Sequence, residues 1–280
     1  MNKKILRIIL MSLLAVVFAV SVGMMIFYQI EHQKTLADAE EAARLAGLHQ
    51  GTESRPPETA PPTAGSPEVA EPPEEGPPEG SLPEEALDLA GIDLGALREV
   101  NGDVVGWISI PGTIVSYPLI QGKDNRYYLR RNWKKESRNA GCIFLEAEVS
   151  RDLTDFHTII YGHLMTDETM FGILKYYREA DYWREHPRIY IVMDDGIYRY
   201  DIFAAHETPL TAIVYRLDVE KKHLEEEFIR FCKEQSVWDS ELTPEASDRI
   251  LTLSTCTGNG YSKRWVVHGV LAQEYSRTNI

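Results

Sequence analysis

Three cysteines carry the most reactive side chains of this sequence, and their surroundings differ. Cys142 lies within an apolar run and Cys232 on an apolar helix face, positions where cysteine acts as a small hydrophobic residue. Cys256 instead follows the apolar stretch 250–255 and precedes the polar run 257–260. A thiol at a strand end beside a loop can be reached by substrate, which makes Cys256 the candidate nucleophile among the three cysteines.

An arginine follows this cysteine at the spacing of a hairpin. Arg264 opens the next apolar strand eight residues after Cys256, so a hairpin would bring its guanidinium close to the thiol. In that position the guanidinium could stabilise a thiolate or an oxyanion. An arginine at the start of a strand is also often an ordinary solvent-exposed residue. The spacing alone therefore leaves both the catalytic and the structural interpretation open.

Thiol catalysis also needs a group that exchanges protons, and histidine is the usual one. A single glycine separates His163 from the β-rich run 157–161. This places His163 at the end of a strand, as is also the case for Cys256. His268 shares a strand face with Arg264 at period two and is the second candidate. The spacing of the residues does not decide between the two histidines.

The elements that must position these residues are mostly strands. Alternating or β-rich apolar runs predict strands over 104–110, 142–145, 158–161, 189–193, 197–206, 249–255 and 264–271. Asp194, Asp195 and Gly196 are interpreted as a hairpin turn rather than as a catalytic acid pair. Helical patterns cover 87–100, 170–177 and 218–236. About eight short strands with two or three helices predict an α+β domain, mostly β, built on a closed barrel with peripheral helices.

Composition excludes several classes of function. The 280-residue chain has a net charge of −14, of which residues 31–90 carry −11, and this acidic balance argues against a nucleic-acid binder held by a basic patch. It contains no glycine-rich phosphate loop, HExxH or Cys-x-x-Cys motif, so we predict no cofactor and no metal. Three cysteines are too few for a disulfide-built scaffold.

The N-terminal segment indicates a membrane anchor. Ile8 to Ile30 contains no charged side chain, and 23 helical residues at about 1.5 Å each span a bilayer core of about 30 Å. A cleaved signal peptide is the alternative, but its apolar core would be shorter and would end in a small-residue cleavage site. Lys3, Lys4 and Arg7 precede the span, which predicts a cytoplasmic N-terminus and an extracellular remainder.

The chain therefore divides into three parts: a cytoplasmic tip and transmembrane anchor over residues 1–30, a tether over 31–86 and a folded domain over 87–280. Residues 31–90 hold 14 acidic and three basic side chains, and ten of the 15 prolines lie between Pro56 and Pro83. Residues 31–50 are rich in Ala and Glu and could continue the helix out of the bilayer, whereas residues 51–83 lack the apolar surface to offset chain entropy, so we predict a disordered tether.

The sequence resembles the sortases, which are membrane-anchored cysteine transpeptidases of Gram-positive bacteria, and it resembles their class B most closely. The resemblance covers residues 94–274 and rests on five motifs that occur in the family's order. These are VVGWISIP at 104–111, QGKDN at 121–125 followed by YYL at 127–129, IYGH at 160–163, TLSTC at 252–256, and Arg264 with the two valines at 266–267. The long helix at 218–236 and the absence of a C-terminal apolar span and of an Asp-Pro-aromatic lid favour class B.

The resemblance implies an eight-stranded sortase barrel and a two-step acyl transfer. Cys256 would attack a threonine carbonyl in the C-terminal sorting motif of a secreted protein, with His163 as acid and base and Arg264 as oxyanion donor. The acceptor would be the amine of a peptidoglycan precursor, so that surface proteins are anchored to the cell wall. By the same resemblance the peptide groove would include Asn125, Leu129, Tyr161 and Ser254, whose alternative is ordinary packing.

Three alternatives to this function stay open. A cysteine peptidase of the same fold would release the acyl group to water, and a pilin-polymerising sortase would use a lysine amine. An anchored domain that only binds a wall component would leave Cys256 unreactive. Acyl transfer to an amine and selective thiol labelling distinguish these possibilities.

Overall fold

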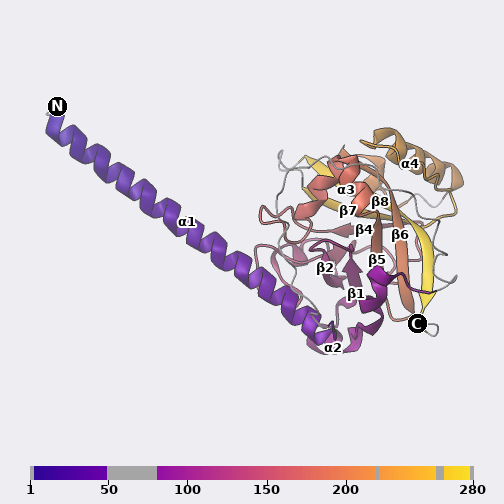
Figure 1. Ribbon diagram of the computed structural model, residues 1–280. Helices are drawn as coiled ribbons and strands as arrows, with labels where there is room; N and C mark the ends of the chain where they lie inside the picture. The colour runs from indigo at the N-terminus through magenta and orange to yellow at the C-terminus, as the bar shows by residue number, and fades with distance from the viewer. Residues whose placement is uncertain (1–2, 49–80, 219–220, 257–261, 278–280) are drawn as a thin grey trace, which may run out of the picture.

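The structure, a computed structural model, describes residues 3–48, 81–218, 221–256 and 262–277. Its centre is a closed barrel in which the strand order is β1-β2-β3-β4-β7-β8-β6-β5 (Figure 1). The strands are β1 (Val104–Ser109), β2 (Ser116–Ile120), β3 (Phe144–Leu145), β4 (His157–Tyr161), β5 (Arg188–Val192), β6 (Gly196–Pro209), β7 (Ile250–Cys256) and β8 (Lys263–Ser276). The predicted mostly-β barrel with peripheral helices is confirmed.

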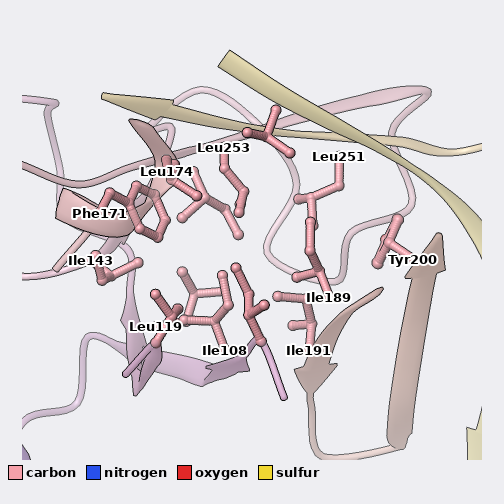
Figure 2. Close-up of a cluster of buried hydrophobic side chains, with 14 of the residues drawn as sticks. Ile108, Leu119, Ile143, Phe171, Leu174, Ile189, Ile191, Tyr200, Leu251 and Leu253 are labelled. Atoms are coloured by element: carbon pink, nitrogen blue, oxygen red, sulfur yellow. The ribbon is translucent and has the colours of Figure 1, made fainter. Parts of the chain in front are cut away.

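Alternate residues of the strands fill the barrel with aliphatic side chains. Figure 2 shows this cluster, in which side chains from opposite walls of the barrel meet. Its fully buried members include Ile108, Leu119, Ile143, Ile189, Ile191, Leu251 and Leu253. β-Branched residues favour strands because their stiff side chains pack well on a pleated surface. The apolar runs of the sequence therefore specify both the strands and the barrel interior.

Two strands that are far apart in the sequence pair in parallel at the barrel wall. β4 pairs with β7 from His157 opposite Ile250 to Tyr161 opposite Ser254. β7 then pairs antiparallel with β8, and this hairpin ends with Cys256 opposite Arg264. The carboxyl ends of parallel neighbours lie at the same edge of a sheet. The chain that leaves β4 and the chain that leaves β7 therefore emerge side by side.

Short helices surround the barrel. They are α2 (Leu94–Val100), α3 (Ala180–Glu185), α4 (Lys222–Gln235) and the 3₁₀ helices η1 (Glu84–Gly91), η2 (Tyr127–Arg130), η3 (Gly172–Arg178) and η4 (Ile213–Tyr215). The helix predicted over 218–236 is α4, which buries Phe228 and Cys232 against strand residues. The helix predicted over 87–100 is divided in two, because the Asp93 side chain caps α2 by accepting from the Ala96 N–H at 3.0 Å.

The turn predicted at 194–196 is present between β5 and β6. The Met193 N–H donates to the Gly196 carbonyl at 2.8 Å, and Val192 pairs with Ile197. Asp195 accepts a hydrogen bond from the Tyr198 hydroxyl at 2.6 Å, and Asp194 pairs with Arg98 at 2.7 Å. Both carboxylates therefore have structural partners around the turn. This agrees with the interpretation of residues 194–196 as a hairpin turn.

Helix α1 (Lys3–Leu45) carries the apolar N-terminal segment and continues well beyond it. It is the one helix of the described residues that is long and apolar enough to cross a bilayer, with a mean hydropathy of 2.5 in its most apolar stretch. The side chains of this stretch are exposed, whereas the C-terminal part of α1 lies against the barrel near β2 and α2 (Figure 1).

The structure corrects the predicted bounds of the disordered tether. Residues 31–45 are helical and docked, and Leu82 and Ala86 near the other end are buried. Of the predicted tether 31–86, residues 49–80 lie outside the described residues. The prediction relied on composition. It allowed the helix to continue beyond residue 30 but did not foresee its docking, although Thr35, Asp38, Ala42 and Ala46 repeat every three to four residues and so share one helix face.

Asp38 is the central contact of this docked helix. Its carboxylate accepts from Arg138 Nε at 2.9 Å and from Asn132 Nδ2 at 2.8 Å, and its backbone carbonyl accepts from Trp133 Nε1 at 2.9 Å. Lys134 lies 3.6 Å from the same carboxylate and 2.6 Å from Glu41. A network of this kind fixes the position of α1 because each partner would otherwise be a poorly solvated polar group.

Replacing Asp38 should release the docked part of α1. Asp38→Ala leaves the half-buried cations of Arg138 and Lys134 without their shared carboxylate, which we expect to cost about 2 kcal/mol. Amide hydrogen exchange across residues 31–45 should then become roughly 30-fold faster. Glu40→Ala, on the exposed face of the same helix, is the matched control. Equal exchange in both variants would show that Asp38 does not hold the helix.

Candidate active site

The candidate catalytic residues lie at one edge of the barrel, where β4 and β7 end. Cys256 is the last residue of β7 and pairs with Arg264, the second residue of β8. Tyr161 ends β4 opposite Ser254, and His163 follows two residues later. The sequence motifs are thereby brought together by strand pairing. The side chain of Cys256 and residues 257–261 lie outside the described residues.

His163 is held by contacts on both its ring and its backbone. Its Nε2 lies 2.7 Å from the carbonyl oxygen of Leu129. A carbonyl can only accept, so Nε2 carries the hydrogen and Nδ1 is the nitrogen left to exchange a proton. The Gly162 N–H donates to the Ser254 carbonyl at 3.2 Å, and the Phe171 N–H donates to the His163 carbonyl at 3.1 Å. The imidazole is thus positioned from β7 and from two loops.

Gly162 is required for this placement of the histidine. A Cβ at position 162 would come within 2.6 Å of both Ile143 and Phe171, two side chains of the barrel core. Any larger residue would push the chain outward and displace His163. The glycine that separates β4 from the histidine therefore acts through close packing, which spacing arguments alone do not reveal.

Arg264 places a positive charge beside Tyr161 and beside the end of β7. Its Nη1 donates to the Lys263 carbonyl at 2.9 Å, and the side chain is half-buried. Burial and the carboxylate of Glu146 raise the pKa of the Tyr161 hydroxyl well above its ordinary value, and the charge of Arg264 acts in the opposite direction. The guanidinium therefore lies near enough to this edge to act on charge that develops there.

The four residues predicted to line a peptide groove lie in different environments. Leu129 is exposed, with its carbonyl bound to His163, whereas Ser254 is buried and its Oγ lies 2.9 Å from the Tyr215 hydroxyl. Tyr161 donates to Glu146 Oε2 at 2.8 Å. Asn125 uses both ends of its amide within the chain: it donates to Glu146, and its oxygen accepts from the Ala147 N–H at 2.9 Å.

Glu146 is a residue of this region that the sequence analysis missed. It is buried and accepts hydrogen bonds from both Tyr161 and Asn125. It thereby ties the end of β4 to the loop that carries Asn125. The chain around it, FLEAEV, contains two glutamates at period two, and nothing in that pattern distinguishes a buried carboxylate from a solvated one.

His268, the second histidine candidate, is enclosed beneath α4. Its Nδ1 lies 2.8 Å from Thr252 Oγ1, which lies equally close to His157 Nε2, and the ring of His206 stacks on it with centroids 5.0 Å apart. Burial lowers the pKa of His157 to about 3 and that of His206 to about 4. Burial and the two neighbouring histidines lower the pKa of His268 well below its ordinary value. A neutral, enclosed imidazole is unsuited to protonating a leaving amine.

The two cysteines predicted to be structural are free and buried. Cys142 lies under α1 and Cys232 under α4, and burial raises the pKa of both thiols well above the ordinary value. Since the thiolate is the reactive form, neither should act as a nucleophile.

Alkylation should therefore select one cysteine of the native protein. Brief treatment with iodoacetamide is expected to label Cys256 and to leave Cys142 and Cys232 unmodified until the chain is denatured, because only a solvated thiol can form the thiolate readily. Peptide mass spectrometry before and after denaturation checks this. Labelling of the three cysteines at similar rates in the native state would contradict the assignment.

Comparison with known proteins identifies the family of the chain. The family described as the sortase domain matches residues 108–272. Sortase B of Listeria monocytogenes is 39% identical over 179 residues, which are 62% of this chain and 72% of the relative. Sortase B of Staphylococcus aureus is 35% identical over 161 residues, which are 58% of this chain and 66% of the relative.

Solved structures show the same barrel. The Staphylococcus aureus sortase B–substrate complex has a TM-score of 0.61 and 33% identity, over 64% of this chain and 84% of the solved chain. A sortase B from B. anthracis has a TM-score of 0.59 and 34% identity, over 64% and 83% of the two chains. Fold and family together define a cysteine transpeptidase built on a closed barrel. The chain belongs to the sortase family and, within it, to class B.

Proposed function

We propose that this sortase cleaves a C-terminal sorting motif of secreted proteins with Cys256 and transfers the acyl group to an amine of a peptidoglycan precursor. The observation that carries the proposal is the pairing of Cys256 with Arg264 at the end of the β7–β8 hairpin, beside the β4 strand that leads to His163. This arrangement provides a nucleophile, a fixed cation and a proton carrier at one barrel edge.

The first step starts from a thiolate on Cys256 and an imidazolium on His163. The thiolate sulfur attacks the threonine carbonyl carbon, and the carbonyl π electrons move onto oxygen. Arg264 donates hydrogen bonds to this oxyanion. When the oxyanion collapses, the peptide C–N bond breaks, and His163 gives its Nδ1 proton to the departing amine. The products are a thioester on Cys256 and a neutral imidazole that keeps its Nε2 hydrogen bond to Leu129.

In the second step the acceptor amine attacks the thioester carbonyl and loses a proton to His163 Nδ1. Collapse of the second oxyanion forms the new amide and releases the Cys256 thiolate, so the starting protonation state is restored. Two solved relatives support these substrate classes, since one is described as a sortase B–substrate complex and another as sortase B complexed with triglycine.

The proposed location is the outer face of the cell membrane. Helix α1 would cross the bilayer once, with Lys3, Lys4 and Arg7 on the cytoplasmic side and the catalytic domain, 87–280, outside. In this arrangement residues 1–30 form the anchor, residues 31–45 form a helix that docks on the catalytic domain, and the acidic, proline-rich chain joins that helix to η1. Digestion of intact cells by an external protease should remove the barrel and leave the N-terminus protected.

An acyl-transfer assay tests the proposed activity. Full-length enzyme in detergent is incubated with a peptide library ending in candidate sorting motifs, with and without triglycine, and the products are read by mass spectrometry. We expect a peptide–triglycine adduct and a thioester on Cys256. Hydrolysed peptide alone, at any triglycine concentration, would instead identify a cysteine peptidase. Preference for a lysine side chain over triglycine would identify a pilin-polymerising enzyme.

A further inference from the structure

A strongly basic segment stands out in this acidic protein. Residues 121–140 contain seven lysines and arginines and two acidic residues, whereas the whole chain carries a net charge of −14. The basic residues are Lys123, Arg126, Arg130, Arg131, Lys134, Lys135 and Arg138. A local excess of positive charge attracts anionic groups, either within the chain or outside it.

Three of these seven residues are neutralised within the protein. Lys134 and Arg138 pair with Asp38 and Glu41 of α1, and Lys135 pairs with Asp103 at 3.0 Å. The other four have no ion pair with any residue that the structure describes. They fall within residues 123–131, which we name the basic loop, and Arg131 stacks on the ring of Tyr127 at 4.3 Å from its centroid.

The basic loop lies close to the point where α1 leaves its apolar stretch. Ile30 is the last residue of that stretch, and the next two residues of α1 already contact the domain. Glu31 accepts from Asn139 at 3.4 Å, and His32 pairs with Asp167 at 2.7 Å. If the apolar stretch lies in the bilayer, Asn139 and Asp167 are at the level of the lipid headgroups.

Backbone hydrogen bonds connect the chain around Asn139, at the depth of the lipid headgroups, to the basic loop. The Arg138 N–H donates to the Arg130 carbonyl at 3.0 Å, and the Cys142 N–H donates to the Tyr128 carbonyl at 3.2 Å. The run 128–131 therefore lies directly beside 137–142, the run that contains Asn139. In Figure 1 the apolar half of α1 projects away from the barrel on the side of its magenta loops.

The exposed side chains of the basic loop suit a lipid headgroup layer. Lys123, Arg126 and Arg130 are exposed, and between them Tyr127 and Leu129 keep 38% and 36% of their surface accessible. Tyrosine is enriched at bilayer interfaces because its ring is apolar and its tip polar, and arginines there attract anionic headgroups. Contact with a headgroup layer would therefore account for both the exposed apolar and the exposed cationic side chains of the basic loop.

We propose that the basic loop binds anionic lipid headgroups, so that the barrel has a second membrane contact besides α1. The contact would hold Leu129, whose carbonyl binds His163, at the bilayer surface. The inference rests on insertion of α1 in the membrane and not on the proposed chemistry. Two other occupants would be the acidic chain 51–80, which holds seven glutamates, and a discrete inorganic phosphate.

Hydrogen exchange of the full-length chain in nanodiscs tests the proposal. One nanodisc contains phosphatidylcholine alone, and the other contains equal parts of phosphatidylcholine and phosphatidylglycerol. We expect amide exchange over 123–131 to be roughly tenfold slower in the anionic nanodisc, because each basic residue near an anionic surface contributes roughly a fivefold preference. The difference should disappear in 1 M salt, where the Debye length is about 3 Å.

Matched triple variants locate the effect. Lys123→Gln, Arg126→Gln and Arg130→Gln together should abolish the difference, whereas Arg184→Gln, Arg216→Gln and Arg230→Gln, three exposed arginines elsewhere, should retain it. Both variants should keep wild-type activity on soluble peptide in detergent, so failure of the proposed activity would be seen separately.

Three results would overturn the proposal. Equal exchange of 123–131 in the two nanodiscs would exclude a lipid contact, and faster exchange after neutralising the glutamates of 51–80 would then identify that chain as the occupant. Protection by 1 mM inorganic phosphate in the neutral nanodisc would identify a phosphate site. Extraction of the protein from either membrane by carbonate would show that α1 is not inserted, and the loop would then have no bilayer to contact.

Discussion

Arg264→Lys is expected to lower kcat by about a hundredfold or more while leaving the melting temperature nearly unchanged. Lysine keeps the positive charge at this position but loses the planar fork that can direct two N–H groups at an oxyanion. The expected loss is that of one directed oxyanion donor. Arg264 is half-buried at the start of β8 and contributes little to the core, so stability should hardly respond. Steady-state kinetics on a cleavable peptide and a thermal melt measure the two effects.

Arg199→Lys is the matched control for this substitution. Arg199 is also half-buried, lies on the neighbouring strand β6 and pairs with Asp201 at 3.0 Å, away from the end of β7. Its replacement should leave kcat within about twofold of the wild-type value, since it removes no group from the reacting edge. If Arg264→Lys and Arg199→Lys were equally active, Arg264 would be a solvated strand flank and another group would have to hold the oxyanion.

The stability of this protein should fall steeply in acid because of the three histidines beneath α4. Folded His157 and His206 have pKa values of about 3 and about 4, and that of His268 is well below its ordinary value, whereas unfolded histidine titrates near 6.5. At pH values between the folded and the unfolded pKa of these histidines, the unfolded chain binds protons that the folded chain does not. Stability is therefore retained above pH 6.5 and lost as pH falls, by up to about 1.4 kcal/mol per histidine per pH unit.

His206→Phe separates this effect from the titration of carboxylates. Both ring nitrogens of His206 are buried and have no hydrogen-bond partner among the described residues, and the ring packs against Phe231. Phenylalanine fills the same space without binding a proton. The variant should therefore lose less stability in acid than wild type. In urea titrations, its advantage over wild type in free energy of unfolding should increase by roughly 2 kcal/mol from pH 7.5 to pH 4.5.

The control for that comparison is His223→Gln, which replaces an exposed histidine at the start of α4. Its stability should follow the wild-type pH dependence, because this substitution leaves the buried histidine cluster intact. Parallel curves for wild type and His206→Phe would mean that His206 takes up its proton in the folded protein, and the buried-cluster explanation would then be wrong.

Strand pattern and turn chemistry predicted most of the barrel. The apolar runs that became β1, β5, β6, β7 and β8 lie within a few residues of their observed bounds, because their β-branched side chains and bounding turns are local properties. β2 was not predicted, since Pro118 interrupts its pattern. The segment predicted as a helix over 170–177 is the 3₁₀ helix η3, a difference that helical periodicity does not resolve.

The candidate catalytic residues could be proposed from sequence because Cys256 and His163 lie at or just beyond strand ends and Arg264 lies at a strand start. Their mutual placement could not, because the parallel pairing of β4 with β7 joins segments that no local signal connects. The docking of α1 was missed for a similar reason: Asp38 has its partners at Asn132, Trp133 and Arg138. A chain that starts at Ser81 would lose these contacts and uncover Cys142, so it should be less stable than the full-length protein.

The parallel pair β4–β7 also determines when the enzyme becomes competent during folding. His157 bonds to Thr252, which lies 95 residues further along the chain, so this wall of the barrel closes only after a long loop has been ordered. Contacts of such sequence separation form slowly, because loop-closure entropy must be overcome before they contribute. The hairpin β7–β8 can form early from local contacts, with Cys256 and Arg264 already opposed. His163 joins them with the last strand pairing, so acyl transfer should recover in the slowest refolding phase.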